Sequence, residues 1–120
     1  MPLIIPGNGE ALVQFVFARD VAESIALIAE KKARGAFNCA GDEMLSLRGL
    51  VEEMARIAGT APAFRFNSER DGDRFDEAEF PFANENLICG NSRLKALGAR
   101  FTPLLKGLEE DYRGYYSKAV

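Results

Sequence analysis

The stretch from Val13 to Lys32, VQFVFARDVAESIALIAEKK, changes from a strand pattern to a helical pattern within two or three residues. Every second residue from Val13 to Phe17 is apolar, which predicts a strand with at least one buried face. From Asp20 onward the period becomes helical, and one apolar stripe is expected, formed by Val21, Ile25, Ile28 and Ala29. The fold is therefore expected to depend on a direct strand-to-helix junction.

Composition restricts the classes of function. The chain has 120 residues, of which 48% are hydrophobic and 28% charged, as in one ordinary globular domain. Its formal charge of -3 and pI of about 5.0 weigh against a nucleic-acid or anionic-membrane partner. No apolar run approaches the roughly 18 residues of a membrane span, and the amino terminus does not resemble a secretion signal, so a cytoplasmic location is expected.

Histidine is missing from the sequence, and this removes several kinds of catalysis. Neither a Ser-His-Asp nor a Cys-His nucleophile system can form within the chain. A zinc site is not expected either, because Cys39 and Cys89 are the only cysteines and they are not at ligand spacing. Each cysteine lies in a short apolar run, which predicts two buried free thiols.

Local signals predict the remaining elements. Short strands are expected at residues 3–5, 36–40, 63–66 and 87–89, and residues 36–40 are apolar enough to be buried on both faces. Ser46 as N-cap and Gly59 as terminator bound a helix over residues 47–58. A short helix is expected before Gly98, and a last helix after Pro103 has four residues on its apolar side: Leu104, Leu108, Tyr112 and Tyr115.

Two segments between these elements are treated as loops. Gly7-Asn8-Gly9 is interpreted as a tight turn and not as a dinucleotide loop, because Leu12 occupies the place of the third glycine and a strand follows. Residues 67–86 are polar and without a period, as in many functional loops. Within them, Phe80-Pro81-Phe82 is expected to dock on another apolar surface.

Several segments together resemble the carboxy-terminal part of the extended short-chain dehydrogenases/reductases, the NAD-dependent epimerase/dehydratase family. The resemblance covers nearly the whole chain, and no single motif in it is specific. Its segments are Gly7-Asn8-Gly9, residues 15–22 (FVFARDVA), residues 37–41 (FNCAG), Ser46-Leu47, Arg70-Asp71-Gly72-Asp73, residues 92–98 (SRLKALG) and residues 108–112 (LEEDY). It implies a mixed α/β (α+β) fold with short strands and about three main helices, forming a single domain over residues 1–120.

The resemblance also implies a substrate site. In nucleotide-sugar enzymes an Arg-x-Gly-Asp loop contacts the diphosphate and sugar, so Arg70 and Asp73, together with Gln14, are predicted to bind substrate. An Arg can hold a phosphate through two parallel hydrogen bonds, and a carboxylate can accept from ribose hydroxyls. The other interpretation of the loop is a solvated segment with local ion pairs. Val13 stands where the family has a second phosphate-binding Arg, which puts UDP-sugar chemistry in question.

The sequence lacks both the glycine-rich cofactor loop and the Tyr-x-x-x-Lys pair on which the family's catalysis depends. We therefore expect no catalytic residue, no metal and no cofactor in this chain, and NAD(P) in a complete protein that includes a Rossmann domain. The expected partners are a nucleotide sugar or related small molecule and either that domain or a second copy, as a homodimer paired through residues 36–40. The alternatives are a stand-alone binding or assembly module, possibly RNA-associated as in chloroplast stem-loop-binding proteins, and a packing domain without a ligand.

Overall fold

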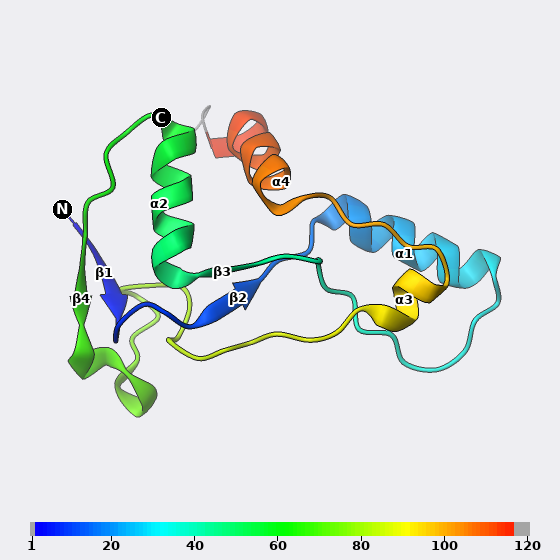
Figure 1. Cartoon of the computed structure of the whole chain (residues 1–120), viewed down its shortest axis with the longest axis horizontal. Helices are drawn as coiled ribbons and strands as arrows, with labels where there is room; N and C mark the ends of the chain where they lie inside the picture. Colours follow the sequence, from blue (N-terminus) through cyan, green and yellow to red (C-terminus); the bar gives the residue numbers. More distant parts are fainter. Residues whose placement is uncertain (1, 117–120) are drawn as a thin grey trace.

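The computed structural model describes residues 2–116, arranged as an elongated mixed α/β chain of 49 × 35 × 19 Å. One end holds β1 (Leu3–Pro6), β4 (Phe64–Asn67) and α2 (Leu47–Ala58). The other end holds α1 (Ala18–Glu30) and the short α3 (Ser92–Ala96), and β2 (Leu12–Gln14) and β3 (Met44–Ser46) connect the two ends (Figure 1). α4 (Leu104–Asp111) packs near α2 and continues into one π-helical turn, Tyr112–Tyr116.

The strands form two separate pairs. β1 and β4 are parallel, with Leu3 opposite Phe64 and Pro6 opposite Asn67, while β2 and β3 are antiparallel. β3 runs directly into α2, whose first turn is capped as predicted: the Ser46 Oγ accepts the Gly49 N–H at 2.9 Å. α2 also ends as predicted, because Gly59 adopts the left-handed conformation that glycine tolerates best.

The core lies between α2 and the strands. Its main cluster consists of Ile5, Val13, Leu47, Val51 and Phe80, and a second cluster joins Leu50 of α2 to Leu104 and Leu108 of α4. The buried Phe80 and the half-buried Phe82 bring residues 80–82 onto this core, and Phe82 meets the Phe15 ring edge-on at 5.7 Å. The surface on which Phe80-Pro81-Phe82 docks is thus this chain's own core.

The strand-to-helix junction exists, but the buried face of α1 differs from the predicted one. β2 ends at Gln14, three residues short of Phe17, and α1 begins at Ala18. The two buried residues of α1 are Asp20 and Ser24, whereas Ile25 of the predicted apolar stripe is 63% exposed. The fully buried side chains of α1 are thus polar, and Ile25 is left uncovered.

Residues 36–40 correct a second prediction. They form no strand, and of these five residues only Ala40 is buried. Their carbonyl groups bond to side chains: Arg93 donates to the Ala36 oxygen, and Asn91 Nδ2 donates to the Ala40 oxygen at 2.9 Å. Among residues 2–116 no neighbouring strand pairs with this segment, so the apolar sequence lacks the partners that a buried strand needs.

Three smaller predictions are also corrected. The expected strand at residues 87–89 is reduced to one parallel bridge between Leu87 and Val13. Both cysteines are free, but Cys39 is only half-buried and Cys89 is exposed, because their segments lie at the surface. Tyr115 is 74% exposed and does not join the apolar side of the last helix, since the backbone has changed to π-helical geometry there.

The surface is large for the size of the chain. The accessible area is 8091 Å², compared with about 6,400 Å² for a typical monomeric protein of 13.2 kDa. The radius of gyration is 16.5 Å, compared with about 13.6 Å for a compact domain of this length. No helix within residues 2–116 is long and apolar enough to cross a membrane.

Candidate functional site

The predicted loop residues lie at the carboxyl ends of two parallel strands. β1 runs into the Gly7-Asn8-Gly9 turn, and β4 runs into two short 3-10 helices, Ser68–Arg70 and Gly72–Arg74. The Gly7 N–H donates to the Asn67 carbonyl at 2.9 Å, which holds the two strand ends together. Ligands of α/β sheets bind outside the carboxyl ends of strands, so this is the candidate substrate site.

A cluster of amides joins the turn to the loop. Asn84 Nδ2 donates to Asn8 Oδ1 at 3.0 Å and to Asp71 Oδ1 at 3.1 Å, and its Oδ1 accepts the Ala11 N–H at 3.0 Å. Gly7 has a φ of +60°, and a Cβ there would overlap the Asp71 carboxylate. The close approach of turn and loop therefore requires glycine at this position.

Arg70 is engaged by a carboxylate of its own chain. Its Nε donates to Glu79 Oε2 and its Nη2 to Glu79 Oε1, each at 3.0 Å, in the two-pronged geometry that arginine also uses for phosphates. The hydrogen bond and the charge of Glu79 raise the pKa of the Arg70 guanidinium, which remains protonated. Of the two interpretations of this loop, the one with local ion pairs describes Arg70 in the structure.

Asp73 and Gln14 lie in different surroundings. Asp73 is exposed on the second 3-10 helix, and its carboxylate has no hydrogen bond or ion pair with any residue of the described chain. Gln14 of β2 instead bonds to backbone groups: Nε2 donates to the Gly41 oxygen at 2.7 Å and the Cys89 oxygen at 3.1 Å, and Oε1 accepts the Cys89 N–H at 2.8 Å. The structure joins Arg70 and Asp73 on one loop and places Gln14 against other segments.

The charge of the loop is unusual for an anion site. Residues 69–79 contain six carboxylates and two arginines, a net charge of -4 within a chain of net charge -3. Val13 is 4% exposed and belongs to the main core cluster, so the position at which the resemblance places a second Arg faces the interior. A diphosphate would thus meet two arginines, of which Arg70 is already paired with Glu79, among six carboxylates.

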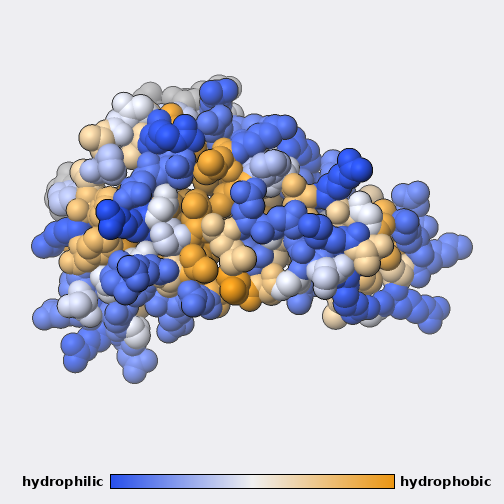
Figure 2. Space-filling view, viewed as in Figure 1, coloured by the Kyte–Doolittle hydropathy of each residue, from blue (hydrophilic) through white to orange (hydrophobic). Residues whose placement is uncertain are grey.

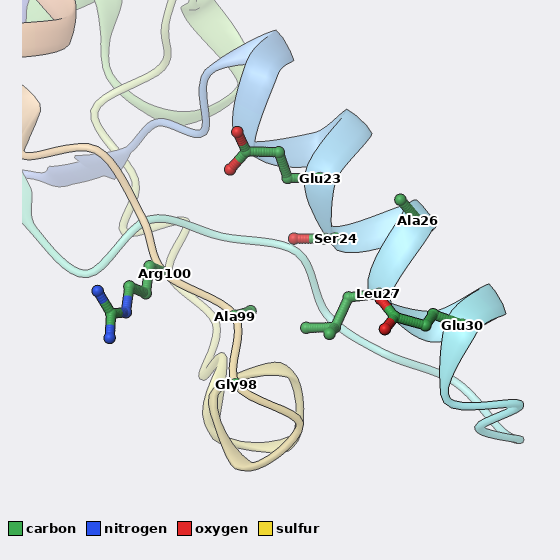
Figure 3. A pocket seen from close by; sticks show the side chains of 8 residues that line it. All are labelled: Glu23, Ser24, Ala26, Leu27, Glu30, Gly98, Ala99 and Arg100. Atoms are coloured by element: carbon green, nitrogen blue, oxygen red, sulfur yellow. The ribbon is translucent and has the colours of Figure 1, made fainter.

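Hollows also lie elsewhere on the surface. A groove of about 310 Å³ separates α1 from residues 98–100; Ser24 and Leu27 point toward it, while the Arg100 side chain extends away from α1 (Figure 3). A larger hollow of about 950 Å³ lies between α2, α4 and residues 15–19. Figure 2 shows hydrophobic surface between α2 and α4, and the apolar side chains that line this hollow are Phe15, Phe17, Leu50, Met54, Phe82 and Leu108.

Sequence reasoning missed the residues that shape the loop. Glu79 and Asn84 lie 9 and 14 positions after Arg70. Both are in the segment of residues 67–86, which has no hydrophobic period, so no spacing signal in the sequence marks them. Asp20 lies in the first turn of α1, and its carboxylate accepts hydrogen bonds from the N–H and hydroxyl of Thr102, a contact across 82 positions that no local pattern indicates. No cluster of three or more ligand-type side chains that could hold a metal ion occurs among the described residues.

The sequence matches no model of a known family, and no curated protein matches it. Solved structures do match. UDP-glucuronic acid 4-epimerase from Bacillus cereus, in complex with UDP-glucuronic acid and NAD, matches 99% of this chain at 21% identity with a TM-score of 0.73, over 36% of its own length. UDP-N-acetylglucosamine 4-epimerase from Methanobrevibacter ruminantium matches 98% at 19% identity with a TM-score of 0.74, over 35% of its length.

dTDP-glucose 4,6-dehydratase from Bacillus anthracis, in complex with NAD, matches 98% of this chain at 16% identity with a TM-score of 0.72, over 34% of its length. The chain thus spans about a third of the length of each of these enzymes. At these identities the comparison shows the fold alone. The predicted resemblance to part of the epimerase and dehydratase fold is confirmed at that level, as is the mixed α/β class.

Proposed function

We propose that this chain is the substrate-binding, carboxy-terminal region of an NAD(P)-dependent epimerase-, dehydratase- or reductase-like protein, and that it is not catalytically complete alone. The observation that carries the proposal is the match of nearly the whole chain to one third of nucleotide-sugar enzymes whose structures contain NAD. The proposed substrate is a nucleotide sugar or a related small molecule, and the proposed location is the cytoplasm.

The loop at the carboxyl ends of β1 and β4 supports this role. It offers a ligand the free carboxylate of Asp73, and the amides of Asn8 and Asn84 hold the turn against the loop. Carboxylate and amide groups at a strand end suit the hydroxyl groups of a sugar, which can donate and accept hydrogen bonds. Arg70 and Asp73 are therefore proposed as substrate-binding residues, and Gln14 as a residue that supports the site by tying β2 to residues 41 and 89.

The residues of this chain do not fit a dinucleotide. The Gly7-Asn8-Gly9 turn connects two strands and does not open a helix, so no helix amino terminus faces a pyrophosphate. The Asp71 carboxylate lies against Gly7, and its charge would repel such a group. NAD(P) is accordingly assigned to the remainder of the protein, which we propose covers Ile25 of α1 and the unpaired residues 36–40.

Nuclear magnetic resonance of the ¹⁵N-labelled chain tests the substrate site. The chain is titrated with a panel of nucleosides, free sugars, sugar phosphates and nucleotide sugars, and with NAD⁺ and NADP⁺. At least one of the panel compounds is expected to shift the amide signals of residues 7–9 and 70–74, and the dinucleotides are expected to shift none. If no panel compound moves these signals, or if only the α2–α4 hollow responds, the chain does not carry the substrate site.

The large exposed surface favours a second candidate, an assembly module. The accessible area exceeds that of a typical monomer of the same mass by about 1,700 Å², more than the share of about 800 Å² that each partner contributes to a standard interface. Self-association through residues 36–40 into a homodimer would cover part of it. Sedimentation equilibrium tests this candidate: a single 13.2 kDa species at tens of micromolar would exclude it. RNA remains an unexpected partner, given the charge of -3.

A further inference from the structure

We infer that Glu79 is a specificity-determining residue, which holds Arg70 away from phosphate binding, and that the substrate of this site lacks a nucleoside diphosphate. The inference rests on the proposed function, because it concerns the ligand of the same loop. Of the two proposed substrate classes, the nucleotide sugar and the related small molecule, the inference favours the second: a sugar-like compound without a diphosphate.

The first argument is the geometry of the pair. Arginine presents two hydrogen-bonding edges, one formed by Nε and Nη2 and the other by the two Nη atoms. Glu79 occupies both positions of the first edge, at 3.0 Å each. The Arg70 and Glu79 side chains are 38% and 26% exposed, so the pair is partly withdrawn from solvent. A phosphate would have to displace Glu79 or bind an arginine whose charge is already neutralised.

The second argument is the electrostatic surroundings. The charges of Asp76 and Glu69 also act on the Arg70 guanidinium. If a diphosphate displaced Glu79, it would leave an unpaired carboxylate beside these two and beside its own negative charges. The loop as a whole has a charge of -4, so every approach of a diphosphate to Arg70 is opposed.

The third argument concerns the other arginines. Arg74 lies on the loop itself and its side chain has no hydrogen bond or ion pair among residues 2–116, but the six carboxylates of residues 69–79 outnumber the two arginines. Val13 occupies the position in β2 where the resemblance places a further arginine, and it is buried in the core cluster. Arg19, the nearest arginine in sequence, donates to Thr102 at 3.1 Å and pairs with Glu110 at 3.4 Å. The neutral groups at the loop, such as the Asn84 amide, place no such penalty on a ligand without charge.

The test uses the 120-residue chain and UDP as the probe, at low ionic strength, with binding followed by NMR. Glu79→Gln removes the competing charge and keeps the shape of the side chain. It is expected to raise the affinity for UDP about three- to fivefold, the change produced by removing one like charge a few ångströms away in a largely aqueous setting. Glu77→Gln, an exposed acid on the same loop with no partner among residues 2–116, is the matched control and is expected to change the affinity less.

The double variant Arg70→Ala/Glu79→Gln shows whether the gain in UDP affinity depends on Arg70 or only on the lower negative charge of the loop. If it depends on Arg70, the gain should vanish in the double variant. Thermal unfolding of each variant, followed by circular dichroism, shows whether the loop change leaves the fold intact. An unchanged or weakened UDP affinity in folded Glu79→Gln would overturn the inference, as would a wild-type chain that binds UDP as tightly as the variant. These outcomes are distinct from failure of the proposed function, in which no panel compound binds the loop at all.

Discussion

The buried carboxylate of Asp20 is predicted to be the main polar anchor of α1. Asp20 is 3% exposed, and it accepts the Thr102 N–H at 2.7 Å and the Thr102 hydroxyl at 2.9 Å. Asp20→Ala removes both charged acceptors and leaves the Thr102 N–H without a partner. Hydrogen bonds to a charged group contribute about 1.5 to 3 kcal/mol each, and part of this is offset because the charge no longer has to be buried. We therefore expect a loss of about 2 to 4 kcal/mol in the free energy of unfolding.

Urea denaturation followed by circular dichroism measures this loss, and amide hydrogen exchange at Thr102 locates it. Glu23→Ala serves as the matched control, because Glu23 lies on the same helix, is exposed and makes no hydrogen bond or ion pair within the described residues. The control is expected to change the unfolding free energy by less than about 0.5 kcal/mol. Equal effects of the two substitutions would show that the Asp20–Thr102 contact does not anchor α1.

Two further predictions concern packing and pH. Gly107→Ala should destabilise the chain despite the better helix propensity of alanine, because a Cβ at Gly107 would overlap the Phe17 ring. Gly114→Ala, with open space around the glycine, should not destabilise the chain, and thermal unfolding compares the two variants. The hydrogen bond from Asn91 is the largest cause that lowers the pKa of Asp42 below its usual value of 3.8. The stability from this bond should be present above pH 3.8 and be lost as the pH falls through the lowered pKa, so Asn91→Ala should flatten the acid limb of a pH–stability curve.

The parts of the fold that the sequence predicted depend on local signals. α2 begins after Ser46 and ends before Gly59, as expected, because capping and termination are decided within a few residues of each helix end. The start of α1 was also predicted to within two residues. The conformation of residues 36–40 was not predicted correctly. A strand requires a neighbouring strand, and the apolar character of these residues indicates only that they would suit a buried strand if a neighbour were present.

The residues of the candidate site were likewise predictable only in part. The sequence indicated Arg70 and Asp73 through a short motif, and the structure places both on the loop after β4. The partner of Arg70 could not be predicted, because Glu79 lies in an aperiodic segment whose path is set by the docking of Phe80 in the core. Gln14 illustrates a further limit: the sequence shows an amide on a strand, but only the fold shows that it bonds to Gly41 and Cys89.

The two ends of the molecule differ in what stabilises them, and this has a consequence for dynamics (Figure 1). The end with α2 contains both hydrophobic clusters, whereas the buried residues of α1 itself are Asp20 and Ser24. Burial of apolar area is the dominant favourable term in folding, so the α1 end has the weaker support. Regions with few buried apolar contacts open at the lowest free energy in amide exchange. α1 should therefore exchange faster than α2 in the isolated chain, and a partner that covers Ile25 should slow α1 selectively.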